Sequence, residues 1–369
     1  MSSIIKVIGK ILLILIILIA IVIITGLLFL KFYPAIGEMP GAEQRKQFAE
    51  QTDLYYDNQF HNENEIPLIN GEGYPSSSRR KPAEMIKAET PDLLTELSEN
   101  DLTYTWIGHS SFLLQFGTVN ILVDPVFSDT ASPVSFAGPK RFSELPLTID
   151  ELPEIDVLLL SHDHYDHMDY ETIKNISSKV GLFVVPLGLD SILKGWGVDG
   201  ERIVALDWWE NTEVDGLTIT LTPSQHYTGR NPLKRSSTYW GGYYMDNGIH
   251  KVYYTGDGGY YDVFERIREK LGAPDLMIAE CGQYDPAWGW IHMFPEQTVQ
   301  AAIDTGAEWV IPVHWGTFCI CNHAWDDSII RFTTGASENG LNIATPRIGQ
   351  TVSYDNIDTF NEKWWEEYE

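Results

Sequence analysis

The sequence has few cysteines and few basic residues, and each shortage excludes a class of protein. It contains three cysteines in 369 residues, Cys281, Cys319 and Cys321. That number is too small for a disulfide framework, so we expect the fold to be held together by its core. Lysine and arginine total 25 against 52 aspartates and glutamates, which gives a formal net charge of −27. A surface of this charge repels phosphate backbones, so we predict no nucleic-acid partner.

Two common catalytic motifs are also absent. The sequence contains no P-loop and no G-x-S-x-G elbow, which excludes the usual phosphate-binding loop and the usual serine hydrolase. One G-x-G-x-x-G pattern is present at Gly195-Trp-Gly197-Val-Asp-Gly200. A helix-like segment precedes it and a strand-like segment follows it, the reverse of the order in a dinucleotide site. We therefore interpret this pattern as a loop.

The N-terminal region contains one long apolar run, from Ile11 to Leu30. Twenty such residues are long enough to cross the hydrocarbon core of a bilayer. The alternative is a cleaved signal peptide, but the run is longer than the usual apolar region of one and no A-x-A-like site follows it. We expect a single-pass transmembrane anchor over residues 1–31. Basic residues occur on both sides of the run, so its orientation in the membrane stays open.

The rest of the chain divides into a polar segment and a long segment of alternating strands and helices. Residues 32–100 are polar and interrupted by Pro and Gly, which predicts a linker or surface wrap with little core. From residue 101 to 369, short β-rich runs are separated by loops or helical patterns without a linker-like break. With 44% hydrophobic residues, this part can bury a large core. The pattern predicts one α/β domain over 101–369.

Four potential metal ligands lie together at one predicted strand exit. The segment Ile155-Asp-Val-Leu-Leu-Leu-Ser161 has the composition of a buried strand and leads directly into His162-Asp-His164-Tyr-Asp166-His167. Alternate residues of an extended chain share a face, so His162 and His164 are predicted to converge on one ion. As the chain turns, Asp166 and His167 are placed to hold a second ion. Imidazole and carboxylate groups suit Zn²⁺.

Three further candidate ligands follow separate β-rich runs later in the chain. They are His226, Asp257 and His314. A single His or Asp at a strand end is commonly a cap or a solvated loop residue. Because all three follow runs of similar length, we predict that they open onto one edge of the same sheet and complete the two metal sites.

This ordered set of seven residues resembles the signature of the metallo-β-lactamase superfamily. More closely, residues 105–332 resemble the branch that contains N-acylphosphatidylethanolamine-hydrolysing phospholipase D and the bacterial ascorbate-phosphate lactonase-like proteins. The segments that carry the resemblance are Trp106-Ile-Gly-His109-Ser, Leu122-Val-Asp124-Pro, Ser161-His-Asp-His-Tyr-Asp-His-Met-Asp169, Gln225-His226, Thr255-Gly-Asp257-Gly-Gly-Tyr260 and Val313-His-Trp-Gly-Thr317.

The resemblance implies an αββα sandwich, preceded here by one transmembrane helix, with two metal ions at the sheet edge. It implies two Zn²⁺, or another divalent transition metal, that activate a shared hydroxide. Asp166 and Asp257 are expected to take part in catalysis as well as metal binding. The implied ligands are His162, His164 and His226 for one ion, Asp166, His167 and His314 for the other, and Asp257 as the bridge between them.

The resemblance also assigns roles to two residues outside the ligand set. Asp124 matches a family position that orients a metal-site histidine, and the alternative is a turn-opening Asp before Pro125. His292, in the loop Trp288-Gly-Trp290-Ile-His292, resembles the substrate-side histidine of the family. There it would donate a hydrogen bond or a proton to the substrate. The alternative is a surface histidine in an aromatic loop.

The sequence departs from the lipid-cleaving enzymes at positions expected to line the substrate cleft. It reads Glu280-Cys281-Gly282-Gln283 where those enzymes carry a less polar stretch, and Tyr227 replaces a Trp after His226. Further along, Cys319-Ile-Cys321-Asn-His323 raises the possibility of a thiolate metal site. We prefer two small thiols near the pocket, because a closed structural zinc site needs about four ligands.

These observations predict a membrane-anchored, metal-dependent hydrolase. The leading hypothesis is a phosphodiesterase of phospholipase D type that acts on N-acylphosphatidylethanolamine-like lipids. The alternatives are a lactonase or esterase for a small acidic or phosphorylated substrate, and a non-catalytic metal-binding scaffold. The sequence leaves open the oligomeric state and the side of the membrane on which residues 101–369 lie.

Overall fold

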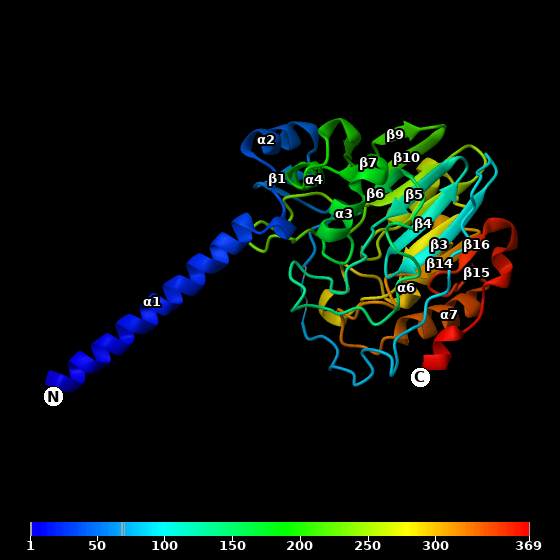
Figure 1. Ribbon diagram of the computed structural model, residues 1–369. Coiled ribbons are helices and arrows are strands. Elements are labelled where there is room, and N and C mark those ends of the chain that lie inside the picture. Colours follow the sequence, from blue (N-terminus) through cyan, green and yellow to red (C-terminus); the bar gives the residue numbers. More distant parts are fainter. Residues whose placement is uncertain (1, 68, 70, 369) are drawn as a thin grey trace.

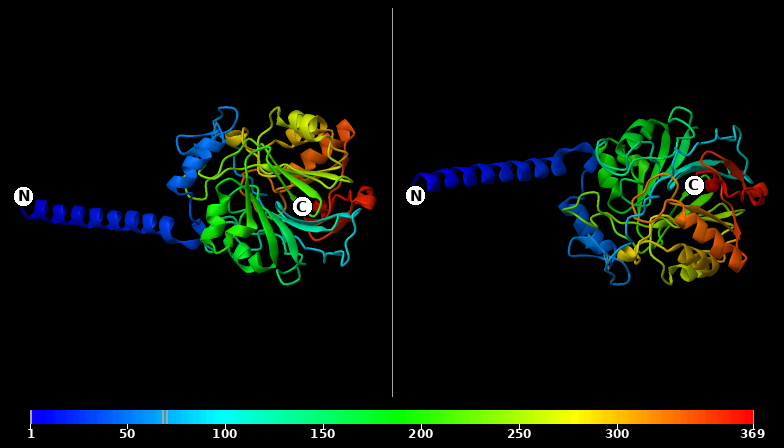
Figure 2. Two further views of the ribbon diagram at one scale, coloured as in Figure 1. Left: turned by 90° about the horizontal axis from the view of Figure 1, so that it is seen from above. Right: turned by 90° about the horizontal axis from the view of Figure 1, so that it is seen from below.

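Two stacked β-sheets with helices on their outer faces form the body of the molecule (Figures 1 and 2). The computed structural model describes residues 2–67, 69 and 71–368. Met1 and Glu369, the outer limits of the predicted anchor and of the predicted α/β domain, lie outside the described residues. The layer order is helix, sheet, sheet, helix, so the predicted αββα sandwich is confirmed.

The first sheet has seven strands and is mixed. Its strands β3, β4 and β5 form an antiparallel meander, and β5 through β8 run parallel. A tight turn at Gly117 joins β4 and β5. In sheet order the strands are β16 (Thr351–Ser353), β3 (Leu102–Gly108), β4 (Ser111–Phe116), β5 (Val119–Val123), β6 (Ile155–Leu159), β7 (Val180–Pro186) and β8 (Ile203–Leu206).

The second sheet also has seven strands. Strands β12 to β15 run parallel, while β9, β10, β11 and β12 pair antiparallel, so β10 points in the same direction as β12. In sheet order the strands are β15 (Asn342–Ile343), β14 (Trp309–Val313), β13 (Leu276–Glu280), β12 (Lys251–Tyr254), β11 (Gly242–Asp246), β10 (Leu217–Thr222) and β9 (Asn211–Val214).

Helices cover the outer face of each sheet (Figure 2). On the first sheet lie α3 (Tyr170–Ile176) and α4 (Leu189–Gly195), and on the second lie α5 (Val263–Leu271), α6 (Pro295–Thr305) and α7 (Asp327–Asn339). Short 3₁₀ helices occur at Pro34–Ile36, Ser177–Lys179, Gly200–Arg202, Pro286–Trp288, Tyr354–Thr359 and Trp364–Tyr368. The Gly195–Gly200 pattern is the loop between α4 and a 3₁₀ helix, so the dinucleotide-site interpretation was rightly set aside.

The period-2 geometry of the strands separates two cores. In β4, Phe112 and Leu114 pack between the sheets, while Leu113 packs toward α3 and α4. Successive side chains of a strand point to opposite faces, and both faces of this sheet are covered. The sequences of these strands are therefore continuous apolar runs, and this pattern identifies them in the sequence.

The segment 32–100 contributes more to the core than the sequence indicated. It contains α2 (Ala42–Gln51) and the hairpin of β1 (Tyr55–Tyr56) and β2 (Gln59–Phe60). Phe48 and Phe60 are 3% and 2% exposed and belong to the core between the sheets. The expectation of little core here was wrong, because a few aromatic anchors in a polar segment leave no periodic pattern.

The N-terminal helix α1 (Ser2–Phe32) extends away from the sandwich as a single rod (Figure 1). Its span Ile4–Phe32 is long and apolar enough to cross a membrane, and none of its most apolar window is buried. Just after the helix, the chain is attached to the sandwich. Trp196 Nε1 donates to the Pro34 carbonyl at 2.8 Å, and Arg230 Nε donates to the Ala35 carbonyl at 2.7 Å.

Candidate metal centre

All seven predicted metal ligands lie together where strands of both sheets end. The motif His162–His167 follows β6 of the first sheet, whereas His226, Asp257 and His314 follow β10, β12 and β14 of the second. The prediction that His226, Asp257 and His314 open onto one edge of the same sheet is confirmed, and the motif after β6 reaches this edge from the other sheet. The ligands meet because β10, β12 and β14 share a direction, so their C-terminal ends reach the same edge of the sandwich as β6.

One group of three imidazoles converges at this edge. His162 Nε2 lies 2.9 Å from His164 Nδ1, and His226 Nε2 lies 3.3 Å from the same atom. His162 and His226 are 1% and 0% exposed. His226 Nδ1 is 2.9 Å from the Ile291 carbonyl, so it donates there and leaves Nε2 with a free lone pair. Three nitrogens so placed suit one cation.

A second group forms beside it around Asp166. Asp166 Oδ2 is 3.3 Å from His314 Nε2 and 3.6 Å from His167 Nε2. A fourth residue, His109, was not predicted: its Nε2 is 3.0 Å from the same Asp166 oxygen. His109 follows β3 directly and is fully buried. Its signal in the sequence was a histidine at a strand end, the same signal that identified the other ligands.

Asp257 lies between the two groups. Its Oδ2 contacts imidazoles of both, at 3.1 Å from His167 Nε2, 3.3 Å from His314 Nε2, 3.8 Å from His162 Nε2 and 3.9 Å from His226 Nε2. A carboxylate in this position can bind two cations at once.

The donor set fits metal ions. His167 Nε2 and Asp257 Oδ1 are buried and have no hydrogen-bond partner among the described residues. Buried polar atoms are nearly always paired, so such atoms at the centre of a cluster fit a site that binds a cation. His and Asp side chains at these spacings suit Zn²⁺ and other divalent transition metals.

The Cys319–His323 segment does not form a comparable cluster. His323 Nε2 lies 3.0 Å from the Gly282 carbonyl and its Nδ1 lies 2.7 Å from the Ala324 carbonyl. Within the described part of the chain, no group of metal-binding side chains includes Cys319, Cys321 or His323. Their arrangement agrees with the interpretation of the two cysteines as free thiols.

Asp124 supports the ligands from beneath the cluster. Its Oδ2 accepts from His167 Nδ1 at 2.8 Å and from the Tyr254 hydroxyl at 2.6 Å, and its Oδ1 accepts from the Ser161 amide at 2.7 Å. These contacts fix the ring of His167 with Nε2 toward Asp257. Of the two alternatives for Asp124, the structure favours the histidine-orienting one.

Three residues of the centre have left-handed backbone conformations. The φ angles are 55° at His109, 41° at Asp124 and 69° at His314. Each residue directly follows the last residue of a strand. Non-glycine residues with positive φ are uncommon and store conformational energy, and they persist where the surrounding structure requires them. Here the turn moves each side chain out of the sheet and toward the cluster.

The electrostatics of the cluster separate its histidines into two kinds. Burial, together with neighbouring imidazoles, lowers the pKa of His162 and His226 well below 6.5 and that of His109 to about 3. Burial also acts on His314, but Asp257 and Asp166 outweigh it and raise its pKa to about 9. The same carboxylates raise the pKa of His167. The first group is thus neutral and ready to bind a cation, while the second holds protons.

We expect metal binding to release protons from this second group. A metal ion binds the unprotonated imidazole, so it must displace the proton that His314 holds below about pH 9. Each proton released makes the affinity rise about tenfold per pH unit, or roughly 100-fold between pH 6 and pH 8. Calorimetric Zn²⁺ titrations of chelator-stripped protein should give heats that depend on the ionisation enthalpy of the buffer. Heats independent of the buffer would contradict this.

The centre opens into a pocket of about 380 Å³. Most of its lining is apolar or aromatic, with Tyr227, Trp288 and Ile291 around the metal-binding side chains. Two further groups face it: His292, and the exposed Arg235, whose guanidinium lies 5.1 Å from the centre of the Tyr227 ring. The structure therefore brings His292 to the same pocket as four of the predicted ligands, His164, Asp166, Asp257 and His314.

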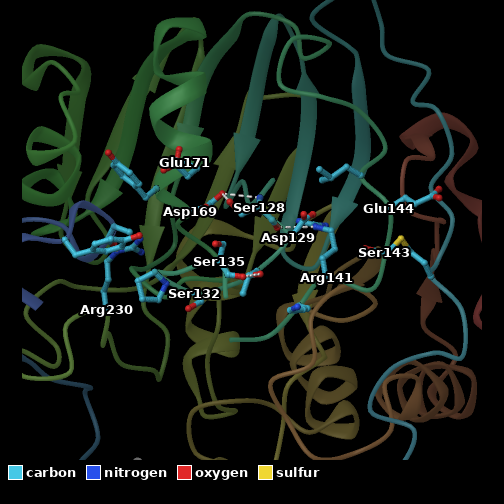
Figure 3. Close-up of a pocket in the computed structure, with 18 residues that line it drawn as sticks. Ser128, Asp129, Ser132, Ser135, Arg141, Ser143, Glu144, Asp169, Glu171 and Arg230 are labelled. Atoms are coloured by element: carbon cyan, nitrogen blue, oxygen red, sulfur yellow. Dashed lines mark hydrogen bonds between the residues drawn. The ribbon is translucent and has the colours of Figure 1, made fainter. Parts of the chain in front are cut away.

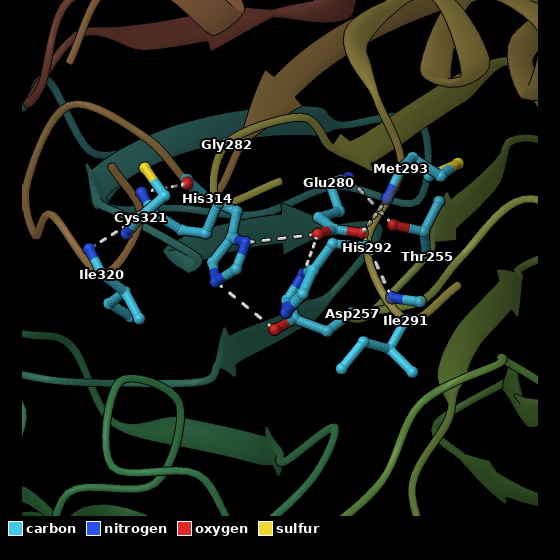
Figure 4. A network of polar contacts seen from close by, with 12 residues as sticks. Thr255, Asp257, Glu280, Gly282, Ile291, His292, Met293, His314, Ile320 and Cys321 are labelled. Carbon is cyan, nitrogen blue, oxygen red and sulfur yellow. Dashed lines mark hydrogen bonds and ion pairs between the residues drawn. The ribbon is translucent and has the colours of Figure 1, made fainter. Parts of the chain in front are cut away.

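His292 is held by a residue that the sequence did not single out as functional. Its Nδ1 contacts a carboxylate oxygen of Glu280, the last residue of β13 (Figure 4). The other polar residue of that stretch, Gln283, uses its amide on backbone groups: Oε1 accepts from Ile320 N, and Nε2 donates to the His314 carbonyl. The polar stretch Glu280–Gln283 thus serves internal contacts and does not make the pocket polar.

A larger cavity, about 1020 Å³, lies elsewhere, beside the attachment of α1 (Figure 3). Its lining includes Arg141, Arg230, Asp129 and Asp169, and none of the predicted metal ligands. Asp169 is the N-cap of α3, where it accepts from Thr172 N. Charges of both signs line this cavity, but its described residues form no group of metal-binding side chains. The smaller pocket is therefore the candidate site.

Comparison with known proteins agrees with this geometry. Residues 119–315 match the family described as "Beta-lactamase superfamily domain". An uncharacterized protein of Mycobacterium tuberculosis is 37% identical over 295 residues, which cover 78% of each chain. The N-acyl-phosphatidylethanolamine-hydrolyzing phospholipase D 1 of Caenorhabditis elegans is 38% identical over 60% of this chain and 65% of that protein.

Two further similarities extend the comparison. The mitochondrial N-acyl-phosphatidylethanolamine-hydrolyzing phospholipase D of Saccharomyces cerevisiae is 30% identical over 76% of this chain and 63% of that protein. Among solved structures, the metallo hydrolase Igni18 of Ignicoccus hospitalis has a TM-score of 0.53 at 19% identity, covering 69% of this chain and 98% of that one. At that identity, the structural likeness establishes the fold.

Proposed function

This chain belongs to the metallo-β-lactamase superfamily, and from that premise we propose that it is a two-zinc phosphodiesterase of phospholipase D type. By its family membership and its cluster of metal-binding side chains, the chain is a metal-dependent hydrolase of this superfamily. The proposal adds the metal, the number of ions and the bond that is cleaved. Its substrate would be an N-acylphosphatidylethanolamine-like lipid.

The observation that carries the proposal is the central position of Asp257. Its carboxylate lies within 3.9 Å of imidazole nitrogens from both ligand groups. In the proposed site, His162, His164 and His226 hold one ion, Asp166, His167 and His314 hold the other, and Asp257 binds both. When bound, such a pair lowers the pKa of coordinated water and offsets negative charge on a reacting phosphate.

Other groups of the pocket support a lipid phosphodiester as the substrate. Arg235 supplies a guanidinium at the pocket, which suits a phosphate oxygen. The apolar lining suits acyl or alkyl chains. His292 faces the same pocket and would donate a proton to the leaving oxygen. Two relatives that bear the phospholipase D name support this choice of chemistry.

A substrate panel tests the proposed function. The full chain, in detergent micelles or nanodiscs and supplied with Zn²⁺, would be assayed on N-acylphosphatidylethanolamine, a nitrophenyl phosphodiester and a lactone. We expect cleavage of both phosphodiesters, with release of the headgroup-side alcohol from the lipid. Hydrolysis of the lactone alone would favour the lactonase alternative, and no hydrolysis of any substrate by metal-loaded protein would favour a scaffold.

We further propose that α1 anchors the protein in a membrane and takes no part in the chemistry. None of its most apolar window is buried, and the hydrogen bonds that join it to the sandwich lie at its C-terminal end and beyond, at the carbonyls of Leu30, Pro34 and Ala35. Deleting residues 1–31 should therefore give a soluble protein that keeps its metal content and its activity on a water-soluble phosphodiester. Sedimentation, elemental analysis and turnover would measure this.

A deeper truncation provides the matched control. Removing residues 1–37 also takes away the Ala35 carbonyl, to which the buried Arg230 donates. Loss of a partner to a buried charged donor costs about 1–3 kcal/mol or more, so this variant should melt at a lower temperature than the 1–31 deletion. Aggregation of the shorter deletion with loss of metal would mean that α1 is part of the folded core.

A further inference from the structure

Glu280 is a fully buried carboxylate next to the metal centre and outside the predicted ligand set. It is 1% exposed. One carboxylate oxygen contacts His292 Nδ1 and lies 3.5 Å from His314 Nδ1 (Figure 4). The other accepts from Gly258 N at 3.1 Å and from Met293 N at 3.5 Å. The two oxygens are therefore not equivalent: one faces backbone donors and the other faces imidazoles.

The backbone of Glu280 is fixed as firmly as its side chain. Its amide donates to Thr255 Oγ1 at 3.0 Å, and its carbonyl accepts from Thr298 Oγ1 at 2.9 Å. Strand β13 lies between β12 and β14, whose ends carry Asp257 and His314. The carboxylate is thus held in one orientation by two neighbouring strands and by the start of α6.

The contact with Glu280 determines which nitrogen of His292 is available to a substrate. A carboxylate accepts, so Nδ1 must carry the proton that it donates. The described residues supply no hydrogen-bond partner for Nε2, and His292 lines the metal pocket. Nε2 is therefore the atom that faces the pocket. With Nδ1–H directed at Glu280, a proton carried by Nε2 faces the pocket and can pass to a substrate.

We propose that Glu280 is a positioning residue that makes His292 a proton donor for poor leaving groups. The inference rests on the proposed phosphodiesterase function. As a water oxygen bonds to phosphorus and the P–O bond to the alcohol breaks, the Nε2 proton passes to the departing oxygen. His292 is then neutral, and its Nδ1–H still donates to Glu280. Nε2 regains a proton from solvent, and solvent also takes up the proton released by the attacking water.

This role identifies the substrate class more closely. An alkoxide is a poor leaving group and needs a proton as the bond breaks, whereas a nitrophenolate leaves without one. A site in which a buried carboxylate holds a proton donor suits diesters of aliphatic alcohols, such as the headgroup esters of phospholipids.

The variant Glu280→Gln tests the inference. The amide oxygen should keep the acceptor position toward Gly258 N and Met293 N, so the NH₂ group should turn toward the imidazoles. It would then donate to His292 Nδ1 and prevent that nitrogen from carrying a proton. We expect kcat to fall about 10- to 100-fold on an alkyl phosphodiester and less than about threefold on a nitrophenyl phosphodiester, with metal content unchanged.

A double variant separates positioning from a purely structural role. If Glu280 acts through His292, then adding Glu280→Gln to His292→Ala should change kcat on the alkyl substrate no further. Multiplying effects, an equal loss on both substrates, or loss of metal from Glu280→Gln would each overturn the inference. These outcomes concern Glu280 alone, whereas a wild-type protein inactive on every phosphodiester would refute the proposed function.

A measurement on the wild-type protein does not depend on activity. In full-length protein with ¹⁵N-labelled histidine, loaded with Zn²⁺, the nitrogen shifts of the His292 ring report which nitrogen is protonated. His292→Ala identifies the signal. We expect Nδ1 to carry a proton, as its contact with the Glu280 carboxylate requires. A ring protonated only at Nε2 would overturn the inference, whatever substrate the enzyme cleaves.

Discussion

Replacing Asp257 by Ala should remove both metal ions and nearly all hydrolysis. The Asp257 carboxylate lies 3.1 Å from His167 Nε2, 3.3 Å from His314 Nε2 and 3.8 Å from His162 Nε2, so it belongs to both ligand groups. Its loss also leaves the imidazoles without the negative charge that draws cations to them. The ions supply several kcal/mol of transition-state stabilisation, which corresponds to a fall in kcat/KM of about 10³-fold or more.

Elemental analysis after gentle purification gives the direct measurement. Wild-type protein should carry close to two equivalents of metal per chain, and Asp257→Ala well below one. The control is His323→Ala, because His323 is a buried histidine whose ring nitrogens already face the Gly282 and Ala324 carbonyls. It should keep both equivalents. A ratio near zero in metal-supplemented wild type would refute the two-ion site itself.

The seven residues of the cluster could be predicted because each belongs to a segment that follows a recognisable strand, although a single His or Asp at a strand end is a weak signal. The strand before His162 is apolar on both faces, since the sheet is covered on both sides, and its end is unmistakable in the sequence. The strand ends before His226, Asp257 and His314 were similarly visible. The sequence did not reveal that β6 belongs to a different sheet from the others, because sheet membership depends on strand pairing and not on periodicity.

Residues that depend on sheet order were harder to find. Glu280 ends β13, and only the order β12-β13-β14 places it between Asp257 and His314. His109 directly follows β3, and its contact with Asp166 joins residues 57 positions apart, so the sequence does not reveal it. For Glu280 and His109, the sequence shows the ionisable side chain but does not show which residue it contacts in the fold.

Several elements in the C-terminal half of the chain have weak signals in the sequence, for physical reasons. β11 begins at Gly242 after another glycine, and glycine pairs usually mark loops. It is a strand because β10 and β12 pair with it on both sides. β15 has two residues, too few for a periodic pattern. Helix α7 contains Thr333, Thr334 and Gly335, which have low helix propensity, so packing against α6 determines its conformation.

Replacing His292 by Ala should slow the reaction without disturbing the metals. In the proposed site, six ligands and the shared Asp257 would already account for two ions, so a further imidazole in either coordination sphere would close the position that catalysis requires. His292 is instead bonded to Glu280 through Nδ1 and lines the pocket. Loss of one proton donor typically lowers kcat by about 10²-fold or more. That fall is expected on alkyl phosphodiesters.

The matched control for His292 is His250→Ala. His250 lies at the turn between β11 and β12, at the end of the sheet opposite to the metal centre, and its Nδ1 is 3.9 Å from Asp275 Oδ2. It should leave kcat, metal content and melting temperature unchanged. The His292 variant should match it in metal content and differ from it in kcat. A variant that lost one equivalent of metal would place His292 among the ligands, and unchanged turnover on the alkyl substrate would remove it from the reaction.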